Sequence, residues 1–253
     1  MNLTALDILR RKGKERIAVL TAYDFQVASM LDEAGIDILL VGDSMGNVVY
    51  GAPDTLSVTV DDVVRHTQAV ARGAKRALVV ADMPFGSYQP SQETAVKNAV
   101  RFLAEGSAHA VKLEGGRGMA ETIRRLVEIG IPVMGHIGLT PQSIHQLGGY
   151  QMQGKSEADV DRLMADAKAV AQAGAFSVVL ECIQPELAAR ITKDVPIPTI
   201  GIGSGPDCDG QVLVSNDLFG LTVSFVPKFV KPLANARALI TEAAKGFVRQ
   251  VKG

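Results

Sequence analysis

Four acidic residues stand directly after apolar, strand-like runs. LLVGD ends at Asp43, LVVAD at Asp82, AVKLE at Glu114 and SVVLE at Glu181. When parallel strands close into a barrel, their carboxyl ends meet at one mouth, so acids far apart in the sequence converge there. Clustered carboxylates repel each other unless positive charge lies among them. The pattern therefore predicts a divalent cation at this mouth.

A simpler role for one such acid is to cap the helix that follows it. Asp43 with Ser44, and also Asp82, have suitable side chains, because Asp and Ser accept hydrogen bonds from the first backbone N–H groups of a helix. Glutamate is a poor N-cap, so capping accounts less well for Glu114 and Glu181. Capping also leaves the whole set of four unexplained.

The types of side chain indicate which cation to expect. Carboxylate oxygens select Mg²⁺, Ca²⁺ or Mn²⁺, whereas zinc more often uses histidine or cysteine. The four histidines show no H-E-x-x-H spacing. Mg²⁺ commonly takes only one or two protein carboxylates and leaves its other positions to water or substrate. Three candidate carboxylates would thus leave room for a chelating ligand.

The run AVKLE contains a lysine as well as its glutamate. Residues two apart on a strand point to the same face, so Lys112 and Glu114 share one direction. Facing the same interior, Lys112 can neutralise the clustered carboxylates or bind a carboxylate of a substrate. A structural Lys–Glu ion pair is the alternative, and the strand by itself leaves both open.

The elements that would position these residues alternate regularly along the chain. Short apolar runs are separated by segments of helical period, several of which end in glycine. The predicted strands cover residues 17–23, 36–42, 77–82, 110–114, 131–138, 176–181, 197–203 and 211–214. Strands that are apolar throughout indicate a parallel sheet buried on both faces. About eight βα units in 253 residues match an α/β fold of the (β/α)₈ TIM-barrel type.

A doubly wound open sheet is the alternative fold, and it often carries a glycine-rich turn after its first strand. Tyr23-Asp24-Phe25-Gln26 occupies that turn here, which favours the barrel. We expect an N-terminal helix capping the bottom of the barrel. A C-terminal helical extension is predicted from about Leu233 to Lys252, after an extended, proline-containing connection at 225–232. No linker or repeat divides the chain, which predicts a single domain over 1–253.

Composition argues against several classes of partner. Lysine plus arginine (26) balance aspartate plus glutamate (27), so the chain has no basic footprint for nucleic acid or anionic membrane. Two cysteines form no disulfide framework and suit a reducing cytosol. The charged start is unlike a signal peptide, and no apolar run approaches the ~18–20 residues of a membrane span. We expect a soluble, cytoplasmic protein that acts on small molecules.

Longer segments carry a resemblance to a known family. VGDSMGNVVYG (41–51), ADMPFGSY (81–88), VKLEGG (111–116) and MGHIGLTPQS (134–143) resemble signature segments of the ketopantoate hydroxymethyltransferase family. LECIQPELA, PTIGIGSGPDCDGQVLV and FVPKF extend the match over nearly the whole chain. The resemblance implies a (β/α)₈ barrel related to the phosphoenolpyruvate/pyruvate-binding barrels.

The same resemblance implies an activity. It is the Mg²⁺-dependent transfer of a hydroxymethyl group from 5,10-methylenetetrahydrofolate to 3-methyl-2-oxobutanoate, giving 2-dehydropantoate in the first step of pantothenate biosynthesis. A homo-oligomer is implied as well, a homodecamer in the bacterial members. The implied roles are Mg²⁺ binding by Asp43, Asp82 and Glu114, substrate binding by Asp43, Ser44, Asp82 and Lys112, and catalytic proton removal by Glu181.

Two other functions are alternatives. A Mg²⁺-dependent lyase or mutase of the same superfamily would act on a small 2-oxo acid without folate, and we would expect its own acid or nucleophile on a mobile loop. The sequence offers no obvious candidate for that group. A non-catalytic keto-acid-binding barrel is the second alternative, although four acids and Lys112 at strand ends oppose stability without a ligand. His136, at the end of PVMGH, either binds the keto acid or is structural.

Overall fold

The computed structural model describes residues 2–253, and its centre is a closed barrel of eight strands. Strands that follow each other in the sequence are neighbours in the barrel and pair in parallel. The strands are β1 (Ile17–Thr21), β2 (Ile38–Val41), β3 (Leu78–Asp82), β4 (Ala110–Glu114), β5 (Val133–Gly138), β6 (Ser177–Glu181), β7 (Thr199–Ile202) and β8 (Gly210–Leu213). Each lies within, or within one residue of, a predicted run, so the (β/α)₈ prediction is confirmed.

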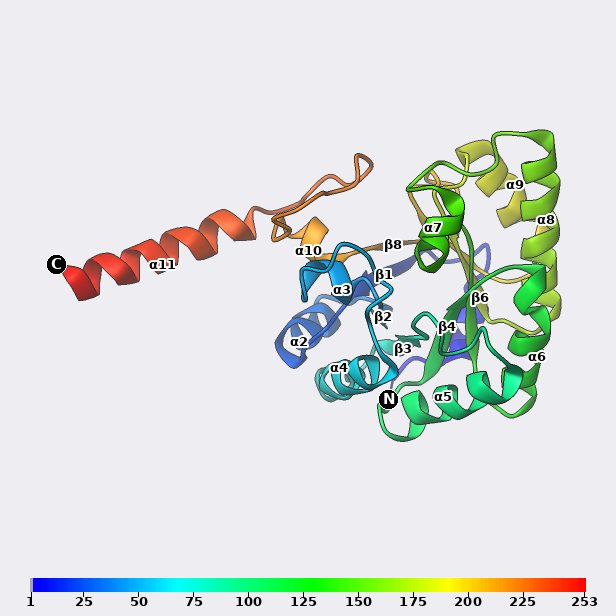
Figure 1. Cartoon of the computed structure of the whole chain (residues 1–253), viewed down its shortest axis with the longest axis horizontal. Helices are drawn as coiled ribbons and strands as arrows, with labels where there is room; N and C mark the ends of the chain where they lie inside the picture. The colour runs from blue at the N-terminus through cyan, green and yellow to red at the C-terminus, as the bar shows by residue number, and fades with distance from the viewer. Residues whose placement is uncertain (1) are drawn as a thin grey trace. The chain divides into compact units, whose positions relative to one another are not determined.

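Helices fill the connections between the strands and surround them (Figure 1). The longer ones are α2 (Phe25–Glu33), α4 (Val60–Gly73), α5 (Gln92–Ala104), α6 (Ala120–Glu128), α8 (Glu157–Gln172) and α9 (Pro185–Asp194). Short helical segments are α3 (Met45–Val48), η1 (Arg117–Met119), η2 (Pro141–Ser143) and α7 (Ile144–Leu147). Helix α4 begins with a reciprocal capping box between Thr59 and Asp62, and Ser91 caps α5. These N-caps define the residues at which the preceding loops end and helices α4 and α5 begin.

The predicted N-terminal helix is present as α1 (Ala5–Leu9), which is shorter than the first dozen residues. Thr4 and Asp7 form its capping box. Ile8 is fully buried and belongs to the same apolar cluster as Ile17 and Ile38, which lie at the start of β1 and at the start of β2. Helix α1 therefore closes the bottom of the barrel with apolar side chains, as expected.

Contacts divide the chain into two compact units, Met1–Val212 and Leu213–Gly253. The second contains α10 (Ser215–Leu218) and α11 (Ala236–Lys252), which confirms the predicted C-terminal helix. The backbone N–H of Leu233 donates to the carbonyl of Leu218 at 2.8 Å, joining the connection to α10. The single-domain expectation for 1–253 stays a prediction.

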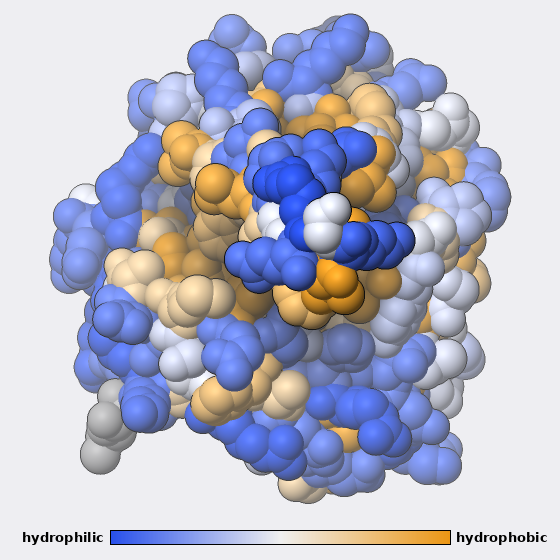
Figure 2. All heavy atoms as spheres, turned by 90° about the vertical axis from the view of Figure 1, so that its left-hand side faces the viewer, coloured by the Kyte–Doolittle hydropathy of each residue, from blue (hydrophilic) through white to orange (hydrophobic). Residues whose placement is uncertain are grey.

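Apolar side chains also reach the surface. Figure 2 shows them scattered among hydrophilic ones on the displayed face. In α11, Leu239, Ile240 and Phe247 are exposed, and none of the helix's residues is buried. Over residues 2–253 no helix is both long and apolar enough to cross a membrane. The exposed apolar residues of α11 are thus one side of an amphipathic helix.

Candidate active site

The barrel interior changes from apolar to charged along the strands. On β3, Leu78 and Val80 belong to the interior cluster, and Asp82 follows them at the same two-residue spacing. Strand β4 repeats this with Ala110 below Lys112 and Glu114. Strands β5 and β6 place His136 above Met134 and Glu181 above Val179. The last interior side chain of each of these four strands is therefore ionisable.

Asp82 and Lys112 form the central ion pair. Strand register places them side by side on β3 and β4, and Lys112 Nζ lies 2.8 Å from Asp82 Oδ1. The same ammonium lies 3.2 Å from His136 Nδ1. Lys112 and Glu114 share a face as predicted, but the ion pair of the lysine is with Asp82. The structural ion pair of Lys112 is thus a cross-strand contact with Asp82, and not the Lys112–Glu114 pair of the alternative interpretation.

Glu114 is held by groups from other loops. Its Oε2 accepts a hydrogen bond from the backbone N–H of Gln142 at 3.1 Å, and its Oε1 lies 3.5 Å from His136 Nδ1. The backbone N–H of Glu114 donates to the Tyr88 hydroxyl at 3.1 Å. The side chain is almost fully buried. The glutamate is therefore oriented within the mouth by its neighbours rather than free to turn.

Asp43 and Ser44 do not cap the helix that follows them. Asp43 Oδ2 accepts a hydrogen bond from Gln142 Nε2 at 2.9 Å, and the Ser44 hydroxyl lies 2.9 Å from the Tyr23 hydroxyl. Ser44 precedes α3 without a side-chain cap. The backbone N–H of Asp43 hydrogen-bonds the Asp82 carboxylate, which brings these two acids together. The capping alternative is wrong for Asp43 and Ser44.

Glu181 ends β6 at the more open side of the cluster. Its Oε2 lies 3.2 Å from His136 Nε2, and its side chain is 15% exposed, against 3% for Asp82. The next residue, Cys182, has a φ of 48°, so the chain turns sharply out of the strand. His136 thus stands between Glu181 and Glu114, a central position that its sequence context did not reveal.

Burial dominates the electrostatics of the cluster. It raises the pKa of Asp43 and Glu114, and it raises those of Asp82 and Glu181 to about 7. Burial and the neighbouring Lys112 hold the pKa of His136 well below its usual range, so the imidazole is neutral. One ammonium therefore faces four carboxylates.

The excess of four acids over one ammonium bears on whether these residues suit a bound cation. The desolvated carboxylates ionise fully only if further positive charge joins Lys112, so the donor set suits a hard divalent ion. Yet within the described chain no three Asp, Glu, His or Cys side chains are grouped so that they could hold a metal ion. Lys112 and Gln142 lie among Asp43, Asp82 and Glu114. The site fits Mg²⁺ held directly by one or two of these acids, with water or substrate completing its shell.

Two important side chains carry no charge, and the sequence did not predict that they lie within the cluster of acids. Tyr88 and Gln142 are almost fully buried and contact each other, the hydroxyl donating to Gln142 Oε1 at 2.8 Å. Both lie in segments quoted for the family resemblance, ADMPFGSY and MGHIGLTPQS. That resemblance was the only signal that pointed to them, because a lone tyrosine or glutamine in a loop has no distinctive spacing.

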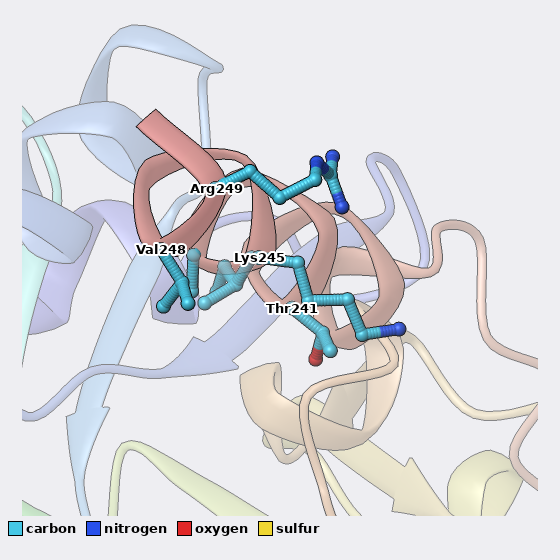
Figure 3. Close-up of a pocket in the computed structure, with 6 residues that line it drawn as sticks. Thr241, Lys245, Val248 and Arg249 are labelled. Atoms are coloured by element: carbon cyan, nitrogen blue, oxygen red, sulfur yellow. The ribbon is translucent and has the colours of Figure 1, made fainter. Parts of the chain in front are cut away.

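A surface hollow along α11 is unrelated to this chemistry. Figure 3 shows Thr241, Lys245, Val248 and Arg249 around it, all from one helix. Ile240 and Ala244 complete the lining. It contains no acid, so it offers no site for a divalent cation.

Solved structures share the fold at low sequence identity. The phosphoenolpyruvate phosphomutase from Streptomyces platensis subsp. rosaceus superposes with a TM-score of 0.66 at 14% identity, covering 99% of this chain and 88% of that one. A phosphonopyruvate hydrolase in complex with oxalate and Mg²⁺ gives 0.64 at 14% identity, with the same coverages. 2,3-dimethylmalate lyase gives 0.61 at 19%, covering 98% and 89%. These likenesses concern the barrel alone.

Sequence relatives are much more similar. The 3-methyl-2-oxobutanoate hydroxymethyltransferase of Syntrophus aciditrophicus is 58% identical over 244 residues, 96% of this chain and 89% of the relative. That of Carboxydothermus hydrogenoformans is 54% identical over 252 residues, 100% and 91% of the two chains. The sequence profile described as Ketopantoate hydroxymethyltransferase matches residues 2–253. On this whole-length agreement, the chain belongs to the ketopantoate hydroxymethyltransferase family.

Proposed function

We propose that this chain transfers a hydroxymethyl group from 5,10-methylenetetrahydrofolate to 3-methyl-2-oxobutanoate, giving 2-dehydropantoate in the first step of pantothenate synthesis. Membership of the family and the names of relatives at 51–58% identity support the reaction. The observation that carries it within the structure is the ring of ionisable side chains at one barrel mouth. A non-catalytic barrel has no need for a cluster of four desolvated acids around one lysine.

Glu181 is the proposed catalytic base. The reaction removes a proton from carbon 3 of the 2-oxo acid, next to the ketone. Of the four carboxylates, Glu181 is the one whose residue is only partly buried, so a substrate in the mouth can reach it. A pKa raised to about 7 makes it a stronger base than an ordinary carboxylate. Glu181 takes the proton, and the electron pair of the broken C–H bond forms the bond to the one-carbon unit. The bonds from that carbon to the folate nitrogens break, which releases tetrahydrofolate, and water supplies the hydroxyl oxygen of the product.

Asp43, Ser44, Asp82 and Lys112 are the proposed substrate-binding residues. The Lys112 ammonium and the Ser44 hydroxyl supply donors for the carboxylate of the keto acid. Asp43, Asp82 and Glu114 would hold Mg²⁺, directly or through water. When bound, Mg²⁺ supplies polarisation of the keto group. Lys112 is the one cation among the described groups of the cluster, so it supplies the positive charge for the carboxylate of an anionic substrate.

Proton exchange at carbon 3 tests this proposal without folate. In deuterated water with Mg²⁺, the chain should exchange the C3 proton of 3-methyl-2-oxobutanoate, as followed by proton NMR. Adding 5,10-methylenetetrahydrofolate should then give 2-dehydropantoate. A chain that neither exchanges this proton nor forms the product with both substrates and Mg²⁺ present would contradict the proposal.

A homo-oligomer, a homodecamer in particular, and a cytoplasmic location are proposed from family membership. Cys182 and Cys208 are both free, which suits a reducing compartment. Sedimentation velocity of the purified chain tests the assembly: a single species near the mass of a monomer would contradict it.

A further inference from the structure

Gln142 joins the carboxyl ends of four consecutive strands, β2 to β5. It lies in η2, after β5, and its amide and backbone contact residues after β2 and β3 and at the end of β4. The residue is 4% exposed, so each of these contacts is made out of water. Its side-chain amide contacts the Asp43 carboxylate, and its backbone N–H contacts the Glu114 carboxylate. This placement makes Gln142 the candidate for a role beyond packing.

The orientation of the Gln142 amide is determined by its partners. Nε2 donates to Asp43 Oδ2 and to the carbonyl of Met83, both at 2.9 Å. Both partners can only accept when the aspartate is ionised, so the NH₂ group has to face them. Oε1 accepts from the Tyr88 hydroxyl at 2.8 Å and from Gln89 Nε2 at 3.1 Å. A flipped amide would set Oε1 against two acceptors and Nε2 against the Gln89 donor, so it would lose three of the four hydrogen bonds.

Gln142 also engages Glu114, through its backbone. The N–H donates to Glu114 Oε2 at 3.1 Å, while the side chain holds Asp43. Each of the two carboxylates therefore has one oxygen engaged by Gln142 and keeps the other for a different partner. Since an amide is neutral, it orients these acids without cancelling their charge, whereas Lys112 neutralises Asp82.

From these contacts we infer that Gln142 is a positioning residue that sets the orientation of Asp43 and Glu114 for divalent-cation binding. Tyr88 supports it, because its hydroxyl accepts from the Glu114 backbone N–H while donating to Gln142 Oε1. Groups that orient metal ligands in this way affect metal affinity by about 10- to 100-fold. The inference rests on the proposed function, which requires the cation.

Mn²⁺ binding by the full chain tests this role without any activity measurement. The free-ion signal in electron paramagnetic resonance reports how much Mn²⁺ is bound in the absence of substrate. Gln142→Met keeps the length of the side chain and the backbone N–H but removes the amide, and we expect it to weaken Mn²⁺ binding about 10- to 100-fold. Gln68→Met is the matched control, since the Gln68 amide donates one hydrogen bond to the Glu105 carbonyl away from the mouth; its Mn²⁺ affinity should equal that of the unaltered chain.

A second variant keeps the test decisive if Gln142→Met does not fold. Tyr88→Phe removes only the hydroxyl that supports the amide and should also weaken Mn²⁺ binding, by a smaller factor. Circular dichroism establishes folding before each titration. A folded Gln142→Met chain, or failing that a folded Tyr88→Phe chain, with unchanged Mn²⁺ affinity would overturn the inference alone. Absence of Mn²⁺ binding by the unaltered chain would instead overturn the proposed function and the inference with it.

Discussion

Asp82 and Lys112 face each other across β3 and β4 as a buried ion pair with an Nζ–Oδ1 distance of 2.8 Å. Burial alone would lower the pKa of Lys112, but Asp82, Glu114 and Asp43 raise it, so the ammonium stays charged. The same burial raises the pKa of Asp82 to about 7 despite the lysine. The Lys112 ammonium therefore stays charged at the barrel mouth, next to acids whose ionisation burial opposes.

Removing the Lys112 ammonium should lower the stability of the folded chain. Lys112→Met leaves four carboxylates without a neighbouring cation, and breaking a buried pair typically costs about 3–5 kcal/mol. We expect the free energy of unfolding, from urea denaturation, to fall by this order at pH 8. The loss should be smaller at pH 5.5, where the acids take up protons instead. Lys245→Met, which removes an exposed lysine paired with Glu242, should change the free energy of unfolding by less than about 0.5 kcal/mol. An equal effect of both substitutions would show that Lys112 is not part of a buried ion pair that stabilises the fold.

Glu181→Gln should remove proton abstraction while leaving the binding site intact. General base catalysis is worth about 10²- to 10⁴-fold, so C3 deuterium exchange should slow by that factor. Binding of Mg²⁺ and of 3-methyl-2-oxobutanoate, measured by calorimetry, should persist. Glu186→Gln, an exposed position on α9 in the same βα unit, should exchange at the unaltered rate. Equal exchange by the Glu181 variant would exclude Glu181 as the base.

The metal-free chain should lose stability as the pH rises. Asp82 and Glu181 have pKa values of about 7 in the fold, above their ordinary values of 3.8 and 4.5. On these acids the folded state binds more protons than the unfolded state, an excess that the lowered pKa of His136 offsets only in part. The free energy of unfolding should therefore fall as the pH rises from about 4 through about 7. Urea denaturation across this range should show the decline, and Mg²⁺ should reduce it by favouring the ionised acids.

Glu181→Gln supplies the control for this pH profile. Glutamine does not titrate, so the decline in the free energy of unfolding between pH 5 and pH 8 should be smaller by about 1–3 kcal/mol. A variant profile parallel to that of the unaltered chain would show that Glu181 does not carry a raised pKa.

Loss of a carboxylate ligand should abolish the response to Mg²⁺. Asp82→Ala or Glu114→Ala should either eliminate hydroxymethyl transfer or make the residual rate independent of added Mg²⁺ after treatment with EDTA. The unaltered chain should lose activity with EDTA and regain it with Mg²⁺. Asp161→Ala, on the exposed side of α8, should behave like the unaltered chain. Full Mg²⁺-dependent activity in either ligand variant would contradict the metal assignment.

The sequence by itself determined the strands, their parallel order and the end at which the acids gather. These properties are local: apolar runs mark buried strands, and the two-residue repeat sets the direction of Asp82, Lys112, Glu114 and Glu181. Nearly whole-length resemblance determined the family as well. Uncharged Gln142 remained hidden, because its partners Asp43 and Glu114 lie 99 and 28 residues away in the chain.

Only the tertiary structure decided which of these groups touch. Strand direction places Lys112 and Glu114 on one face, but the register between β3 and β4 pairs the lysine with Asp82 instead. The register of β5 places His136 beside Glu114, and its imidazole also reaches Glu181. Contacts across strands depend on the stagger of the closed barrel and on the paths of its loops, which no single strand encodes.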